Sequence, residues 1–162
     1  MLFLYFYFMK DSPIGIFDSG IGGLTVANAI KKVLPNENII YFGDTQHLPY
    51  GEKSKKAIQI FSRKIIEFLV SKKCKIIIIA CNSASSVIKK ETTNTYTKTH
   101  IFNVIDPVVH EIVENYSKDC IGVIGTKATI SSGIYEKKIA ELCGNRKIKS
   151  LATPLFAPMI EE

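Results

Sequence analysis

Arginine is almost absent from this 162-residue sequence, which contains 19 lysines but only two arginines. Proteins that read nucleic-acid bases depend on arginine, because its planar guanidinium matches phosphates and guanine edges. The net charge is +6, and the lysines that carry it are scattered along the chain, in pairs such as Lys31–Lys32 and Lys72–Lys73. We therefore interpret the lysines as solvated helix faces and expect no nucleic-acid partner, with a basic nucleic-acid-binding stripe as the alternative.

Cysteine pairs with metal-binding or redox spacing are also lacking. The four cysteines are Cys74, Cys81, Cys120 and Cys143, and no two of them form a C-x-x-C motif. They are too few for a disulfide-rich secreted scaffold. We expect reduced thiols in a cytoplasmic protein and no metal site. The P-loop and the dinucleotide-binding glycine motif are absent as well, which argues against those two classes of nucleotide-binding protein.

No apolar run reaches the length of about 20 residues that a membrane-spanning helix needs. The most apolar stretch is residues 1–10, "MLFLYFYFMK". It lacks the leading positive charge and the small-residue cleavage site of a secretory signal. We interpret residues 1–10 as an apolar extension, disordered or misassigned, with the working chain beginning near Met9. A membrane-touching arm is the alternative, and we expect no membrane partner.

Short apolar runs alternate with longer amphipathic segments from Pro13 onward. The continuous runs of isoleucine, valine and phenylalanine predict buried strands, at residues 14–17, 38–43, 75–80, 100–105 and 120–125. Helical spacing is clearest in one set of apolar residues, namely Ile58, Phe61, Ile65, Phe68 and Leu69. Repeated strand–helix–strand units predict an α/β fold of parallel sheets with helices on both faces.

The polar run at residues 89–100 is the best candidate for a boundary between two lobes. We expect a first lobe at residues 11–98 and a second at residues 99–162. Asp106 and Pro107 have the residue types of an N-cap and a first helical position, and they predict the start of a helix.

Polar loops follow each of the expected strands, at residues 18–23, 43–51, 81–85, 106–107 and 125–129. Ligands bind beyond the carboxyl ends of strands in open parallel sheets. The loops therefore predict a polar pocket for a small ligand with several charges. In the first loop, "DSGIGG", Asp18 would repel a phosphate, so it could accept a proton or bind an ammonium group. His47 could simply hydrogen-bond its own turn, and no histidine is assigned a catalytic role.

Cys81 leaves an apolar strand and opens a helix. The positive end of a helix lowers the pKa of a thiol, which favours the thiolate. Asn82 and Ser83 beside it supply hydrogen-bond donors for a carboxylate. We interpret Cys81 as a reactive thiol, with a small buried hydrophobic residue as the alternative. We interpret the other three cysteines as small buried hydrophobic residues.

Three motifs in sequence order, "PIGIFDSGIGGLTVANAI", "YFGDTQHLPYGEKS" and "IIIACNSAS", resemble those of the aspartate/glutamate racemase family. The resemblance runs from about Pro13 to the last residue. It implies two α/β lobes that face each other across a cleft, and interconversion of L- and D-glutamate without a cofactor, supplying D-glutamate for peptidoglycan and cell shape. In that reaction two cysteines flank the α-carbon, one removing a proton and the other returning one. A homodimer is a candidate assembly.

The resemblance also assigns residues. Cys81 matches the first cysteine, Asp18 supports its thiol, and Glu161 lies near the catalytic centre. The expected substrate-binding residues are Asp18, Ser19, Tyr50, Gly51, Asn82, Ser83, Thr126 and Thr129. Ser83 stands where the family usually has threonine.

The family's second cysteine lies in a motif like "GCTHYP", which this sequence lacks. Neither Cys120 nor Cys143 has a comparable context, so we expect both lobes to be incomplete and the C-terminal part of the architecture to be missing. Two hypotheses follow from this. The chain is a glutamate-racemising enzyme by ancestry in truncated form, or it is a non-catalytic fragment that binds glutamate or a protein partner through one half-site.

Overall fold

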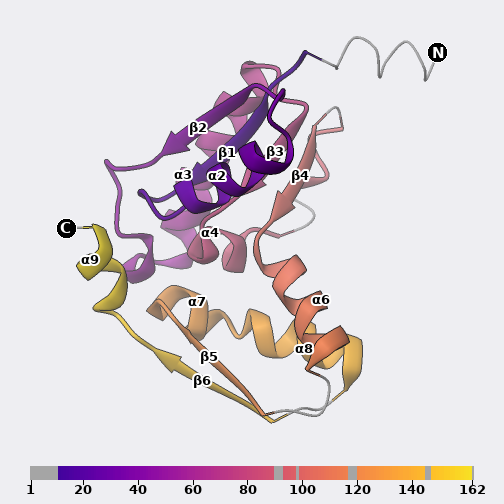
Figure 1. Ribbon diagram of the computed structural model, residues 1–162. Coiled ribbons are helices and arrows are strands. Elements are labelled where there is room, and N and C mark those ends of the chain that lie inside the picture. Colours follow the sequence, from indigo (N-terminus) through magenta and orange to yellow (C-terminus); the bar gives the residue numbers. More distant parts are fainter. Residues whose placement is uncertain (1–10, 90–92, 98, 117–119, 145–146, 162) are drawn as a thin grey trace.

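The computed structural model describes residues 11–89, 93–97, 99–116, 120–144 and 147–161. The interpretation of residues 1–10 therefore concerns residues outside the described part. Strands and helices alternate along the chain (Figure 1), in the order β1 (Ile14–Asp18), α2 (Leu24–Val33), β2 (Ile39–Gly43), the 3₁₀-helix η1 (Tyr50–Glu52), α3 (Lys55–Ser71), β3 (Ile76–Ile79), α4 (Asn82–Val87), β4 (His100–Asn103), α6 (Ile105–Asn115), β5 (Ile121–Gly125), α7 (Lys127–Ser132), α8 (Ile134–Cys143), β6 (Ile148–Ala152) and α9 (Phe156–Glu161).

The larger sheet has four parallel strands in the order β2-β1-β3-β4. All five residues of β1 are buried, as expected for a strand covered on both faces. Phe17 and Ile77 belong to the core cluster that includes α3. Ile14 and Ile16 belong to a second cluster that includes residues of α2. Helices therefore cover both faces of this sheet, which confirms the predicted α/β class.

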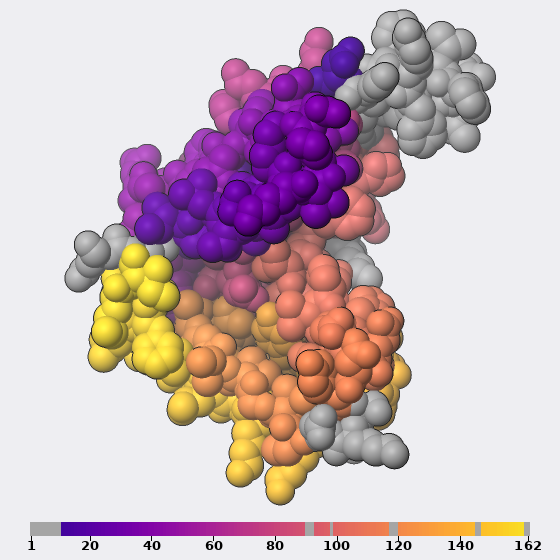
Figure 2. All heavy atoms as spheres, viewed as in Figure 1, coloured from indigo at the N-terminus to yellow at the C-terminus, as the bar shows by residue number. Residues whose placement is uncertain are grey.

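The smaller sheet pairs β5 with β6 in parallel. The burial pattern of β5 alternates between half-buried and exposed residues, so only one face is covered, and α7 and α8 lie on that side (Figure 1). Ile124 and Leu151 are register partners on the other face, and each is 63% exposed. Figure 2 shows the first lobe (indigo to magenta) in direct contact with the second (orange to yellow).

The lobe boundary expected between residues 98 and 99 is misplaced. β4 pairs with β3 from His100 to Asn103, so the polar run at residues 89–100 is a connection within the first lobe. We place the boundary between β4 and α6.

Two local expectations are also wrong. Asp106 and Pro107, expected as the N-cap and the first helical position, both lie inside α6, which begins at Ile105. The side chain of Asn103 accepts hydrogen bonds from the amides of Ile105 and Asp106, at 2.9 and 3.0 Å, and so stabilises the earlier start. Phe68, whose helical spacing places it on the same face of α3 as Ile58 and Ile65, is 40% exposed, whereas those two are buried. It lies edge-on to Phe42, with 5.5 Å between ring centroids.

Within the described ranges, no helix is both long enough and apolar enough to cross a bilayer.

Candidate functional site

The loop after β1 is organised by the carboxylate of Asp18. This residue is 6% exposed, and its Oδ2 accepts hydrogen bonds from the amides of Gly20 at 3.1 Å and Gly23 at 3.0 Å. A Cβ at position 23 would lie 2.6 Å from the Cβ of Asp18, so only glycine allows this close approach. The glycine-rich turn therefore wraps around a carboxylate of the chain itself, where a phosphate-binding turn would leave its amides to the ligand.

Cys81 lies at the N-cap of α4, just beyond β3. The residue is 4% exposed. Its thiol donates to Ser19 Oγ at 3.5 Å, and its Sγ accepts from the amide of Ala84 at 3.4 Å. Because β1 and β3 are neighbouring parallel strands, the loops that follow them meet at one edge of the sheet. This topology brings together Asp18, Ser19 and Cys81, as the sequence predicts.

The expectation of a lowered thiol pKa is wrong. Burial, and after it the negative charge of Asp18, raise the pKa of Cys81 to about 11, and the hydrogen bonds that the thiolate would accept from Ser19 and from the amide of Ala84 offset only part of this. Helix α4 has six residues, so its dipole is small, and desolvation of the thiolate outweighs it. In this state Cys81 is a neutral thiol at neutral pH.

We expect alkylation of Cys81 by iodoacetamide to accelerate up to pH about 11, because the thiolate is the reactive species. Relative to a thiol with the ordinary pKa of 9.0, the thiolate fraction at pH 8 falls by about 100-fold. Timed pulses followed by mass spectrometry of the Cys81 peptide would measure the rate. The exposed Cys120 serves as control in the same digest. A Cys81 rate that levels off below pH 9 would contradict the raised pKa.

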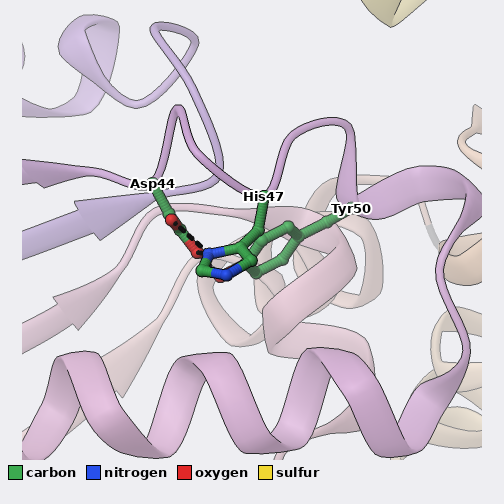
Figure 3. Close-up of polar contacts among 3 residues, drawn as sticks. All are labelled: Asp44, His47 and Tyr50. Carbon is green, nitrogen blue, oxygen red and sulfur yellow. Dashed lines mark hydrogen bonds and ion pairs between the residues drawn. The ribbon is translucent and has the colours of Figure 1, made fainter.

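The loop after β2 contains a second polar cluster, made of Asp44, His47 and Tyr50 (Figure 3). His47 Nδ1 lies 2.8 and 3.0 Å from the two carboxylate oxygens of Asp44. The hydroxyl of Tyr50 donates to Asp44 Oδ2 at 2.5 Å. Burial and the neighbouring Asp44 raise the pKa of Tyr50 above its usual range, so its hydroxyl remains a donor.

Polar side chains also connect the two lobes beside Cys81. Ser83 Oγ lies 2.8 Å from Thr126 Oγ1, which is 3.1 Å from Thr129 Oγ1. The hydroxyl of Tyr135 donates to the side-chain oxygen of Asn82 at 2.8 Å. The two residues that follow Cys81 in the chain thus each contact the second lobe.

Gly51 completes this contact. An ideal Cβ at position 51 would lie 2.6 Å from Thr126 Cβ and 2.8 Å from Thr126 Cγ2. The backbone after Tyr50 therefore packs directly against the start of α7. The expected substrate-binding residues Tyr50, Gly51, Thr126 and Thr129 lie together, although they come from different lobes.

Glu161 is the last residue of α9, but its side chain lies outside the described part, so its expected catalytic role stays a prediction. Sequence reasoning missed Asp44 and Tyr135. Asp44 lies in the motif "YFGDTQHLPYGEKS", directly after an expected strand, and this position is the signal that indicates a site residue. Tyr135 has no such signal, because only the packing of α8 brings it to Asn82.

The other three cysteines lie away from this cluster. Cys74 is 1% exposed in the core. Cys120, expected to be buried, is exposed just before β5, at the opposite end of that strand from Thr126, so that expectation is wrong. Cys143 ends α8 and donates its S–H to the carbonyl of Ile139. Within the described ranges, no group of three or more His, Cys, Asp or Glu side chains could bind a metal ion.

Known proteins share both the sequence and the arrangement of the lobes. The family model described as Asp/Glu/Hydantoin racemase matches residues 24–154. Glutamate racemase 3 from Caldanaerobacter subterraneus subsp. tengcongensis is 44% identical over 154 residues, which cover 95% of this chain and 55% of the relative.

Two solved structures have the same fold. The glutamate racemase of Francisella tularensis, in complex with D-glutamate, gives a TM-score of 0.86 at 40% identity. A glutamate racemase isoform from Bacillus anthracis gives 0.87 at 38% identity. Each match covers 93% of this chain and 56% of the other. The chain thus spans a little more than half the length of the relatives that it matches.

Proposed function

The chain belongs to the Asp/Glu/Hydantoin racemase family, and from this premise we propose that it binds glutamate and moves the α-proton through Cys81 as part of glutamate racemisation. One observation carries the proposal. The thiol of Cys81 contacts Ser19 where two parallel strands end, and the next two residues contact the second lobe. A small ligand at this edge would meet a thiol, a carboxylate, an amide and several hydroxyls.

The proposed binding mode follows from the charges. Asp18 Oδ2 is occupied by two backbone amides, whereas its Oδ1 accepts no hydrogen bond from the described residues and would bind the α-ammonium group. The hydroxyls of Ser83 and Thr126 would donate to a substrate carboxylate. Donors arranged in advance stabilise the negative charge that develops when the α-proton leaves.

Substrate binding would also change the thiol. The charge of Asp18 is one cause of the raised pKa of Cys81. An α-ammonium group bound to Asp18 would offset that charge, and a positive charge near a thiol favours the thiolate. The substrate would therefore lower the pKa of Cys81 toward the range in which a base acts efficiently.

Racemisation needs a second group on the opposite face of the α-carbon. We propose that this role belongs to a second thiol, which the described residues do not bring to Cys81. The product D-glutamate would supply peptidoglycan synthesis in the cytoplasm. The alternative, a non-catalytic fragment that binds glutamate or a protein partner through one half-site, shares the binding step but predicts no proton exchange.

Incubation with D- and L-glutamate in heavy water tests the proposal. We expect deuterium to enter the α-position of at least one enantiomer. Proton NMR measures this exchange, and chiral chromatography measures inversion of the α-carbon. Cys81→Ala should abolish the exchange, and Cys143→Ala, which removes a thiol bonded only to its own helix, should retain it. A folded chain that binds glutamate without exchange would support the non-catalytic alternative.

A further inference from the structure

The loop between β2 and α3 is fixed by one buried carboxylate. Asp44 is 6% exposed, and its backbone amide donates to the carbonyl of Asp18 at 2.9 Å. Its side chain accepts hydrogen bonds from His47 and Tyr50. A buried carboxylate is costly unless it is hydrogen-bonded, so these two donors and the carboxylate stabilise one another. In Figure 3 both rings converge on Asp44 from the same loop.

Helix α3 fixes the other side of these rings. The imidazole of His47 stacks on Phe61, with 4.0 Å between ring centroids and 21° between ring planes. The ring of Tyr50 also contacts Phe61, at 5.9 Å and 41°, and Tyr50 is 1% exposed. Each ring is therefore held between an aromatic side chain and a carboxylate, which leaves the loop little freedom to shift.

The loop determines where Gly51 lies. Tyr50 directly precedes Gly51, and the space for a Cβ at Gly51 is filled by Thr126. Thr126 in turn contacts Ser83, two residues after Cys81. A chain of contacts thus runs from Asp44 through Tyr50 and Gly51 to the lobe-to-lobe contact beside the thiol.

We propose that Asp44 is a positioning residue whose carboxylate fixes His47 and Tyr50 so that Gly51 stays packed against Thr126 and the two lobes keep their register at the glutamate site. The part that concerns glutamate rests on the proposed function. The part that concerns the contact between lobes stands on the geometry alone, and the two are tested by separate measurements.

Three variants separate the contributions. Asp44→Ala removes both hydrogen bonds. Asp44→Asn keeps an acceptor for Tyr50 and can donate to a neutral His47, so it is the conservative rescue variant. Tyr50→Phe removes one donor and keeps the ring on Phe61. Tyr116→Phe, which removes the hydroxyl of a tyrosine that is 49% exposed, is the matched control.

The first measurement is the NMR cross-peak between the α-protons of Gly51 and the methyl group of Thr126. We expect it in the wild type, Asp44→Asn and Tyr116→Phe, and expect it to be weakened or lost in Asp44→Ala and weakened in Tyr50→Phe. The second is the dissociation constant for D-glutamate by calorimetry. Because Asp44→Ala loses the hydrogen bonds to a buried charge, we expect it to bind D-glutamate about tenfold more weakly than the wild type. We expect Asp44→Asn to bind D-glutamate within about threefold of the wild type.

A merely structural role would lower the unfolding midpoint of Asp44→Ala while the cross-peak and the dissociation constant stayed unchanged, which would overturn the proposal. If Asp44→Ala does not fold, the cross-peak is measured in Tyr50→Phe instead. A weakened cross-peak there supports the proposal, and an unchanged one overturns it. If the wild type does not bind glutamate, the proposed function fails, and the cross-peaks still show whether Asp44 sets the contact between lobes.

Discussion

Replacing Gly51 with alanine is expected to lower the free energy of unfolding by about 1–3 kcal/mol, the usual cost of forcing atoms into a packed interior. The new Cβ would lie 2.6 Å from Thr126 Cβ. Thr126 is β-branched, its hydroxyl contacts Ser83, and the same hydroxyl accepts from the amide of Thr129 at the start of α7. It therefore cannot rotate away, and the two lobes must separate.

Urea unfolding of matched variants measures this effect. Gly122→Ala is the control, because a Cβ at position 122 meets nothing within 4 Å and the exchange favours a strand. We expect the midpoint to fall for Gly51→Ala and to stay or rise for Gly122→Ala, and glutamate binding to weaken only in the former. Equal midpoints for the two variants would show that the lobes do not pack at Gly51.

Replacing Asp18 with alanine is expected to make the chain less stable and its thiol more reactive. The amides of Gly20 and Gly23 lose their acceptor, and two hydrogen bonds to a charged group contribute about 3 kcal/mol or more. Burial, the larger cause of the raised pKa of Cys81, remains, but the second cause, the charge of Asp18, disappears. The thiolate fraction at pH 8 therefore rises, and alkylation of Cys81 should accelerate several-fold.

Asp18→Asn separates the two effects. Its amide oxygen still accepts from the glycine amides, so most of the stability should remain, while the charge is gone. We expect alkylation of Cys81 to accelerate in both variants and the urea midpoint to fall mainly in Asp18→Ala. An unchanged pH profile of alkylation in Asp18→Asn would mean that the carboxylate has no electrostatic effect on the thiol.

Local sequence patterns predicted most of the fold. The five expected strands appear, each with bounds shifted by at most two residues. The expected burial holds along the whole of β1 but is wrong for β4 and β5, which alternate between half-buried and exposed residues, because a continuous apolar run does not show whether one face of a strand or both are covered. Strand β6 was missed, since "IKSLA" mixes polar and apolar residues on a sheet with only one covered face. The lobe boundary was missed for a related reason: a polar connection inside one lobe has the same composition as a linker.

The candidate site was predictable in position but not in its electrostatics. The rule that parallel strands end at one edge placed Asp18, Ser19 and Cys81 together. The sign of the Cys81 pKa shift depends on burial and on the distance to Asp18, which no local pattern contains. The contact between Tyr135 and Asn82 depends likewise on how α8 packs across the lobes.

The contact between Ser83 and Thr126 constrains how such proteins can diverge. Ser83 is 4% exposed, its hydroxyl contacts Thr126, and Thr126 also fills the space beside Gly51. One residue of the second lobe therefore has to fit two positions of the first lobe at once. A chimaera that joins this first lobe to the second lobe of a relative would therefore keep the contact only if the relative's residue at the position of Thr126 fits both Ser83 and Gly51.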